Sequence, residues 1–136
     1  MPEEPGAPFA AYIGGMLDEK REGYSRLTLT TGPQHADRNG QVHPGVLTSI
    51  MDSVIGIGLS RLRAGEPRET YRPHATIEMS SSFYAQAEIG DALVFEGRVV
   101  RMGHGVAFGE VETRRASDDE VIARARLAFV VPGGSA

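Results

Sequence analysis

The stretch "HPGVLTSIMDSVIGIGLSR", residues 43–61, is apolar almost all round when it is wound as a helix. At about 100° per residue, the apolar side chains cover an arc of about 220°. The narrow stripe that remains holds small residues and one acid: Gly45, Ser49, Asp52, Gly56 and Ser60. The pattern predicts a buried helix over residues 45–62 whose single carboxylate faces a close neighbour rather than open water.

The rest of the chain offers strands rather than further long helices. Alternation of polar and apolar residues predicts strands over residues 23–31, 74–84, 92–101, 106–115 and 121–131. Short connections between the last four strands predict an antiparallel meander. Because only one long helix is available, the economical packing is an α+β domain in which a five-stranded antiparallel sheet wraps around a central helix.

Length and composition limit the number of domains that the chain can form. The chain has 136 residues, of which 40% are hydrophobic, and this suits one domain with its own core. We expect an N-terminal tail with a short helix over residues 1–20, a single domain over 21–132, and a C-terminal tail over 133–136.

Several function classes are disfavoured. The net charge of −4 argues against a general nucleic-acid binder. The chain has no cysteine, and its four histidines lack ligand spacing, so no metal site is expected. No stretch approaches about 18 apolar residues, which argues against a membrane span. The N-terminus lacks a basic segment typical of a signal peptide, and we expect a cytoplasmic protein.

Asp52 leaves three explanations open. The carboxylate could cap a neighbouring backbone amide, reach solvent at the domain edge, or serve in a site where its neighbours tune its basicity. Pro44 suits the first turn of a helix, where its missing N–H is not needed. The amides of Gly45, Val46 and Leu47 would then be free to hold an anion or a carbonyl oxygen at the helix N-terminus.

Three stretches together resemble a known family. They are "GQVHPGVLTSIMDSVIGIG" (40–58), "ATIEMSSSFYAQAEIGD" (75–91) and "VVRMGHGVAFGEVET" (99–113). The chain resembles the hotdog-fold thioesterases, in particular the phenylacetate-degradation thioesterase-like family. That family places an acid nine residues after a histidine, as His43 and Asp52 are placed here. The resemblance implies a hotdog fold, in agreement with the packing argument.

The same resemblance implies an acyl-coenzyme A thioesterase that releases a carboxylic acid and free coenzyme A. Asp52 matches the family's general base or nucleophile, His43 the residue that orders the loop and the thioester, and Thr76 the hydroxyl that holds the attacking water. No cofactor is implied beyond the coenzyme A of the substrate. The acyl group and the choice between base and nucleophile stay open.

Two positions depart from the family pattern. The glycine that follows the family's histidine is Pro44 here, so Gly45 is the expected donor to the thioester oxygen. The family's asparagine position holds Asp37, which would repel a developing oxyanion, and Asn39 lies two residues further on as a substitute.

The resemblance also implies a homo-oligomer, a dimer or a tetramer, with an active site shared between two subunits. The loop and helix start would come from one subunit, and the acid and hydroxyl from the other. The coenzyme A phosphates would meet residues near the predicted turn over residues 102–105: Arg98, Arg101, Gly103 and His104. The loop arginines Arg63, Arg68 and Arg72 are alternatives for the same role.

Two other functions compete with hydrolysis. One is a non-catalytic acyl-coenzyme A binder or dimeric scaffold, which the two departures would favour. The other is an enoyl-coenzyme A hydratase-like lyase of the same fold, whose Asp-x-Asn-x-x-His motif is faintly similar to "DRNGQVH" (37–43), although the spacing differs by one residue.

Overall fold

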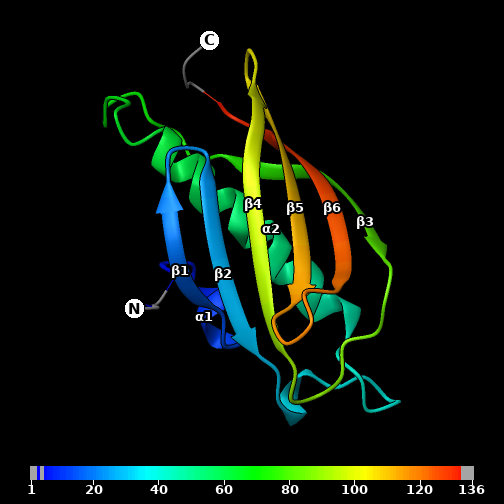
Figure 1. Cartoon of the computed structure of the whole chain (residues 1–136). Coiled ribbons are helices and arrows are strands. Elements are labelled where there is room, and N and C mark those ends of the chain that lie inside the picture. Colours follow the sequence, from blue (N-terminus) through cyan, green and yellow to red (C-terminus); the bar gives the residue numbers. More distant parts are fainter. Residues whose placement is uncertain (1–2, 4, 133–136) are drawn as a thin grey trace.

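The predicted central helix is present. In the computed structural model, which describes residue 3 and residues 5–132, helix α2 runs from Pro44 to Leu62 and lies against one face of a curved sheet (Figure 1). Its buried residues face the strands: Leu47, Ile50, Met51, Val54, Ile55, Gly58 and Leu59. By length and composition α2 could cross a membrane, so the expectation that no stretch approaches this limit is wrong. Here the helix is the one around which the sheet wraps.

The sheet has six antiparallel strands rather than the five predicted. The strands are β1 (Met16–Arg21), β2 (Tyr24–Thr30), β3 (Ala75–Phe83), β4 (Ala92–Met102), β5 (Val106–Arg115) and β6 (Val121–Val130). The strand that the prediction lacked is β1, at one edge of the sheet. Its sequence "MLDEKR" buries only Leu17, so it carries almost no apolar alternation. The α+β class and the hotdog arrangement are confirmed.

The predicted meander is wrong at one connection. The strand order is β1-β2-β4-β5-β6-β3, so β3 lies at the far edge beside β6, and β2 takes its place beside β4. Residues 84–91 do not close a hairpin, because their backbone bonds to other segments. The amide of Tyr84 donates to Ile122, Ala87 accepts from Val42, and Asp91 accepts from Thr31.

Two glycines let the sheet approach the helix closely. A Cβ atom at Gly97 in β4 would lie 2.4 Å from Cγ1 of Val54, and one at Gly109 in β5 would lie 2.6 Å from Cγ2 of Ile55. Both distances are far below van der Waals contact, so the centre of α2 rests directly on the backbones of these strands.

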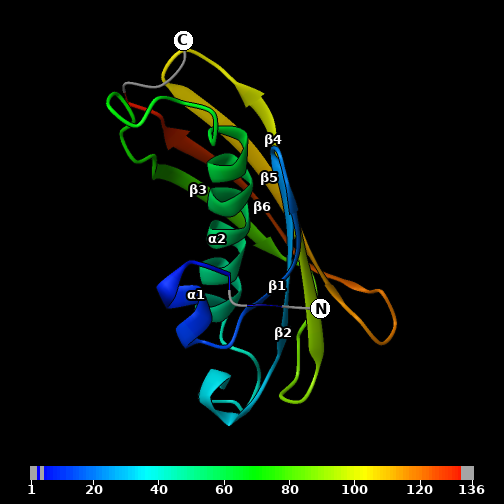
Figure 2. The same ribbon diagram turned by 90° about the vertical axis from the view of Figure 1, so that its left-hand side faces the viewer.

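The two short helices hold the loop before α2. Figure 2 shows α1 (Pro8–Tyr12) beside α2, on the same side of the sheet. In the 3-10 helix η1 (Pro33–His35), buried His35 accepts from the amide of Gly32 at Nδ1 and lies 2.6 Å from the Ile13 carbonyl at Nε2. His35 is therefore a structural histidine that ties residues 32–35 to the N-terminal segment.

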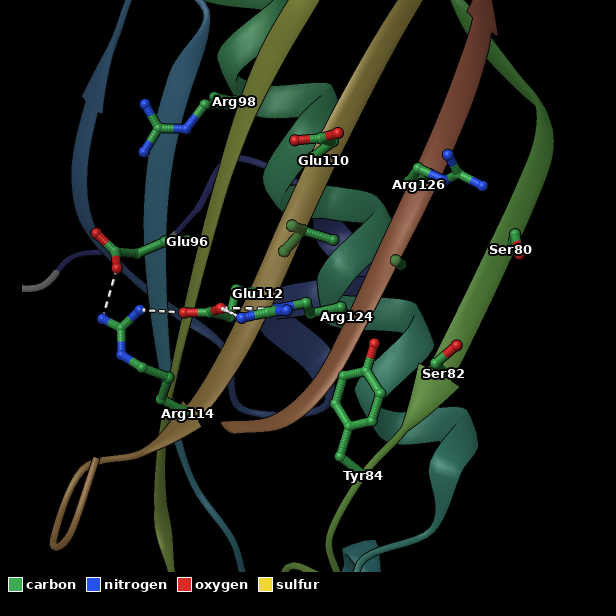
Figure 3. Close-up of a pocket in the computed structure, with 12 residues that line it drawn as sticks. Ser80, Ser82, Tyr84, Glu96, Arg98, Glu110, Glu112, Arg114, Arg124 and Arg126 are labelled. Atoms are coloured by element: carbon green, nitrogen blue, oxygen red, sulfur yellow. Dashed lines mark hydrogen bonds and ion pairs between the residues drawn. The ribbon is translucent and has the colours of Figure 1, made fainter. Parts of the chain in front are cut away.

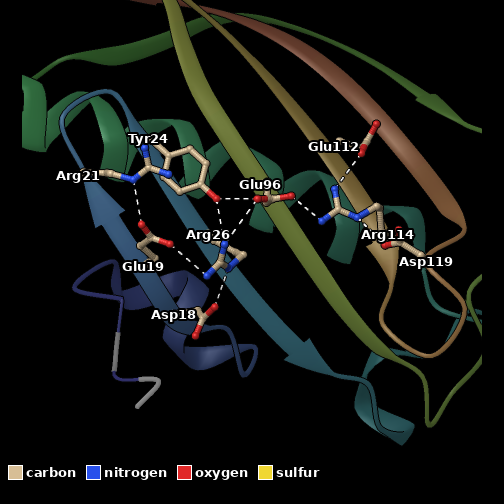
Figure 4. Close-up of polar contacts among 9 residues, drawn as sticks. All are labelled: Asp18, Glu19, Arg21, Tyr24, Arg26, Glu96, Glu112, Arg114 and Asp119. Atoms are coloured by element: carbon tan, nitrogen blue, oxygen red, sulfur yellow. Dashed lines mark hydrogen bonds and ion pairs between the residues drawn. The ribbon is translucent and has the colours of Figure 1, made fainter.

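The outer face of the sheet carries a network of ion pairs (Figure 4). Glu96 on β4 accepts from the hydroxyl of Tyr24 at 2.6 Å and pairs with Arg26 and Arg114. Arg26 also pairs with Asp18 on β1. The hydrogen bond from Tyr24, followed by the two arginines, holds the pKa of Glu96 below its ordinary value. The network links β1, β2, β4 and β5 on the face away from α2.

Candidate active site

The acid and the hydroxyl singled out in the sequence lie together. Asp52 projects from the middle of α2, and Thr76 is near the start of β3. The Thr76 hydroxyl donates to Oδ1 of Asp52 at 2.5 Å. The explanation that Asp52 caps a backbone amide has no support among the described hydrogen bonds, because the partner of its carboxylate is the Thr76 hydroxyl.

The pair lines a cavity of about 790 Å³. One wall is the small-residue stripe of α2, with Asp52, Gly56 and Ser60, and another is the segment from His74 to Thr76. Nothing lies within 4 Å of the position that a Cβ would take at Gly56, so the floor of the cavity beside Asp52 is open. The space is large enough for water and a thioester to reach the carboxylate.

The helix start is arranged differently from the prediction. His43 is the N-cap of α2, and its Nδ1 accepts from the amide of Gly45 at 2.8 Å. The amide of Val46 donates to the carbonyl of His43 at 2.9 Å. The expectation that the amides at the helix start are free is therefore wrong for Gly45 and Val46, which are already bonded. His43 and Gly45 line a separate hollow of about 240 Å³.

These two parts of the predicted site are well apart within one chain. Nine residues separate His43 from Asp52, and a helix rises about 1.5 Å per residue, so the two lie about 13 Å apart along α2. Both hollows lie along the same stripe of small residues. A single thioester carbonyl cannot touch Asp52 and the helix start of the same subunit.

Asp37 and Asn39 form a turn, and neither lines the cavity that contains Asp52. Oδ1 of Asp37 accepts from the backbone amides of Asn39 at 2.8 Å and Gln41 at 3.0 Å. These amides, Gln41 first, hold the pKa of Asp37 below its ordinary value. The side chain of Asn39 is exposed.

The residues predicted to meet coenzyme A divide into two groups. Arg98 projects from the outer face of β4, away from α2, into a groove of about 660 Å³ that it shares with nine other polar side chains (Figure 3). Arg101, Gly103 and His104 lie at the β4–β5 turn. The register Val106↔Val130↔Ala75 places that turn at the same end of the sheet as the start of β3. None of the four lines the Asp52 cavity.

Among the loop arginines, Arg63 is buried rather than solvated, which excludes it as a phosphate ligand in this structure. Its Nε and Nη2 donate to Glu66 at 2.9 and 3.0 Å, and its Nη1 lies 2.9 Å from Nδ1 of His74. His74 also lines the Asp52 cavity and is a site residue that the sequence reasoning missed. Its position two residues before Thr76 in the sequence could have indicated that it belongs to the site. Among the described residues, no group of three or more potential metal ligands gathers.

A central helix wrapped by an antiparallel sheet, with an acid on the uncovered stripe of the helix and a hydroxyl from β3 bonded to it, defines a hotdog-fold protein with a hydrolase-like site. The model of the thioesterase superfamily matches residues 39–122, and the chain belongs to this family. The predicted resemblance to the thioesterases is thereby confirmed.

Individual relatives agree with this assignment. Acyl-coenzyme A thioesterase 13 of Mus musculus is 24% identical over 93 residues, which are 68% of this chain and 62% of the mouse protein. The match thus spans less than two thirds of that relative. The PaaI protein of the E. coli phenylacetic acid degradation operon has a TM-score of 0.82 at 18% identity, covering 96% of this chain and 88% of its own.

A third similar structure contains a ligand. A hypothetical thioesterase protein from Streptococcus pneumoniae TIGR4, solved with coenzyme A, has a TM-score of 0.79 at 17% identity. The match covers 92% of this chain and 94% of that one. At such low identity, these two structures bear on the fold alone.

Proposed function

We propose that the chain is an acyl-coenzyme A thioesterase in which Asp52 drives hydrolysis. The observation that carries the proposal is the hydrogen bond of 2.5 Å from the Thr76 hydroxyl to the Asp52 carboxylate, at the wall of an open cavity. Thr76 holds one carboxylate oxygen, and the other stays available to water or to a thioester. Family membership supports the thioester as the substrate class.

The chemistry follows from the carboxylate. As a general base, Asp52 removes a proton from water while the water oxygen attacks the thioester carbonyl carbon. The tetrahedral intermediate then collapses, the C–S bond breaks, and the thiolate leaves and takes up a proton. As a nucleophile, Asp52 would attack the same carbon and form a mixed anhydride that water then opens. Both routes need the same two side chains.

Coenzyme A as the thiol component is supported by two relatives. The mouse relative is named an acyl-coenzyme A thioesterase, and the streptococcal structure was solved with coenzyme A. An apolar hollow of about 400 Å³ next to the helix start is lined by Pro44, Leu47, Phe83 and Tyr84, among others, and offers space for an acyl group. The location in the cytoplasm stays a prediction.

We infer that the complete site needs a second subunit. Asp52 and the helix start lie along one stripe of small residues but too far apart to touch one carbonyl group. A second copy lying antiparallel across this stripe would bring its own His43 and Gly45 toward Asp52. For Gly45 to donate to the thioester oxygen, the His43 ring must release its amide.

The test is release of free thiol from a panel of acyl-coenzyme A substrates. We expect Asp52→Asn to abolish release while the circular dichroism spectrum and the melting temperature stay close to those of the wild type. Asp119→Asn makes the same chemical change in the β5–β6 turn, where the Asp119 side chain is 84% exposed, and it should leave the rate unchanged. More than a few per cent of wild-type activity in Asp52→Asn would contradict the assigned role.

The same panel separates the two rival functions. Hydration of a crotonyl-type substrate without thiol release would identify the lyase. Tight binding of acyl-coenzyme A with neither reaction would identify a non-catalytic binder.

A further inference from the structure

His74 is a polar residue in the Asp52 cavity that the hydrolysis scheme does not use. It lies in the segment that leads into β3, two residues before Thr76, and it is half-buried. Its ring contacts Phe129 edge to face, with the ring centroids 5.7 Å apart. Phe129 is the register partner of Thr76 in β6. The ring therefore lies where the start of β3, β6 and α2 meet.

Arg63 dictates the protonation of this ring. The guanidinium carries only hydrogen-bond donors, so the Nδ1 atom that it contacts at 2.9 Å must be the unprotonated acceptor. Nε2 then carries the proton, and the backbone of Gly56, one turn beyond Asp52 in α2, is the group that favours a proton on the ring, as a carbonyl acceptor facing that N–H does. Burial, followed by the charge of Arg63, holds the pKa of His74 below its ordinary value.

The Arg63 guanidinium, which donates to His74, is itself held in place. The Arg63 side chain is fully buried, forms two hydrogen bonds to Glu66, donates to the carbonyl of Arg72 at 2.8 Å and stacks on Tyr71 at 4.3 Å. The guanidinium therefore cannot turn away from the imidazole without breaking a buried cluster.

We propose that His74, held neutral in the Nε2–H form by Arg63, is a positioning residue of the Asp52–Thr76 pair. Through Gly56 it ties the start of β3 to α2, next to the point where Thr76 reaches Asp52. This role rests on the proposed thioesterase function. The charged groups around the ring are Arg63 and Glu66 from the loop and Asp52 from α2, and Lys20 and Arg61 line the same cavity.

A neutral ring also matters for the carboxylate. An imidazolium at this place would put a positive charge next to Asp52 and would weaken it as a base. Because Arg63 occupies Nδ1 with a donor, the ring cannot take a second proton without losing that contact. Asp52 thus keeps a neutral histidine rather than an ion-pair partner beside it.

The first measurement needs no substrate. Ring ¹⁵N shifts of the full-length protein at neutral pH should show His74 as the neutral Nε2–H form, and a pH series should show a pKa below its ordinary value of 6.5. A protonated Nδ1 at neutral pH would overturn the proposal.

The second measurement uses three substitutions. His74→Gln keeps a donor near the position of Nε2, His74→Asn keeps an acceptor near that of Nδ1, and His74→Ala keeps neither. We expect His74→Ala to lower kcat by about tenfold or more at nearly unchanged KM, because misplaced groups lose rate rather than binding. His74→Gln, which preserves the link to α2, should recover most of kcat, and His74→Asn less. A kcat of His74→Ala within about twofold of the wild type, or His74→Gln as slow as His74→Ala, would overturn the role.

Ser25→Ala is the matched control. The buried Ser25 hydroxyl donates to the carbonyl of Val54 at 2.8 Å, so this variant also removes a strand-to-α2 hydrogen bond, away from the cavity. It should lower the melting temperature and leave kcat unchanged.

If the wild type releases no thiol from any acyl-coenzyme A, the proposed function fails. The positioning role of His74 can then still be tested without activity. The ring ¹⁵N shifts are then read together with a crystal structure of His74→Ala. In that structure the Thr76 hydroxyl must lie beyond hydrogen-bond distance of Asp52; an unchanged pair would refute the positioning role.

Discussion

Thr76 restricts the Asp52 carboxylate to one orientation, because its hydroxyl donates to a single oxygen of the acid. The open wall at Gly56 leaves room for substrate beside that carboxylate. The proposed chemistry therefore depends on two side chains whose separation is set by the fit of β3 against α2.

Replacing the hydroxyl tests this dependence. Thr76→Ala should lower kcat by about 10²-fold, because the carboxylate loses its only described hydrogen-bond partner and the water loses a ligand. Thr76→Ser keeps the hydroxyl and should retain most of the rate. Steady-state thiol release measures both variants, and equal rates for the two would show that the hydroxyl is not needed.

His74 predicts how stability responds to pH. Its folded-state pKa is lowered from an ordinary value of 6.5, so below that pH the unfolded chain binds more protons than the folded one. The free energy of unfolding should therefore fall as the pH drops below about 6.5, before the carboxylates titrate. His74→Gln should lack this part of the loss. Urea unfolding at about pH 7.5 and pH 5.5 compares the two proteins, and equal losses would contradict the protonation assigned to His74.

Helix α2 was predictable because its apolar arc is wide and its one stripe of small residues is unambiguous. The strands with apolar alternation could be found in the same way. Strand β1 could not, because it is a charged edge strand with one buried side chain. The order of β3 and β4 was also beyond the sequence, since a short connection favours a hairpin and only tertiary contacts of residues 84–91 prevent it.

The same limits apply to the site. Asp52 and Thr76 could be predicted from a motif, which fixes their spacing along the chain. The capping of Gly45 by His43 and the burial of Arg63 depend on side-chain rotamers and on the path of the loop over residues 63–74. Neither can be read from residue types alone.

The close contact of β4 with α2 gives a prediction about packing. Gly97→Ala should destabilise the fold by about 1–3 kcal/mol, because the new methyl group would lie 2.4 Å from Val54 and 2.8 Å from Ile55. Gly65→Ala is a suitable control, since nothing lies within 4 Å of its Cβ position. Denaturant unfolding measures both, and similar stability of the two variants would contradict the packing argument.

The outer network gives a second prediction. Glu96→Gln should lower stability by about 0.5–1 kcal/mol, because Glu96 pairs with Arg26 and Arg114 on a partly exposed face. The difference from the wild type should shrink in about 1 M salt, which screens these pairs. It should also shrink as the pH falls, because the pKa of Glu96 is lowered in the folded state and its contribution is lost on protonation. A difference that salt and acid leave unchanged would show that Glu96 acts through packing.

In the whole molecule, the parts of the site lie at different positions along helix α2. Figure 2 shows the loop before α2 at one end of the helix and the start of β3 toward the other. One chain therefore supplies the acid and the hydroxyl in one hollow and His43 with Gly45 in another. A site shared between two antiparallel copies accounts for both hollows with one substrate.

Subunit complementation tests this account most directly. Asp52→Asn and His43→Ala each damage a different half of the shared site, so each variant alone should be nearly inactive. After the two are unfolded and refolded together in equal amounts, about a quarter of the wild-type thiol release should return, since half of the dimers are mixed and each has one intact site. A mixture no more active than its two components would contradict the shared site.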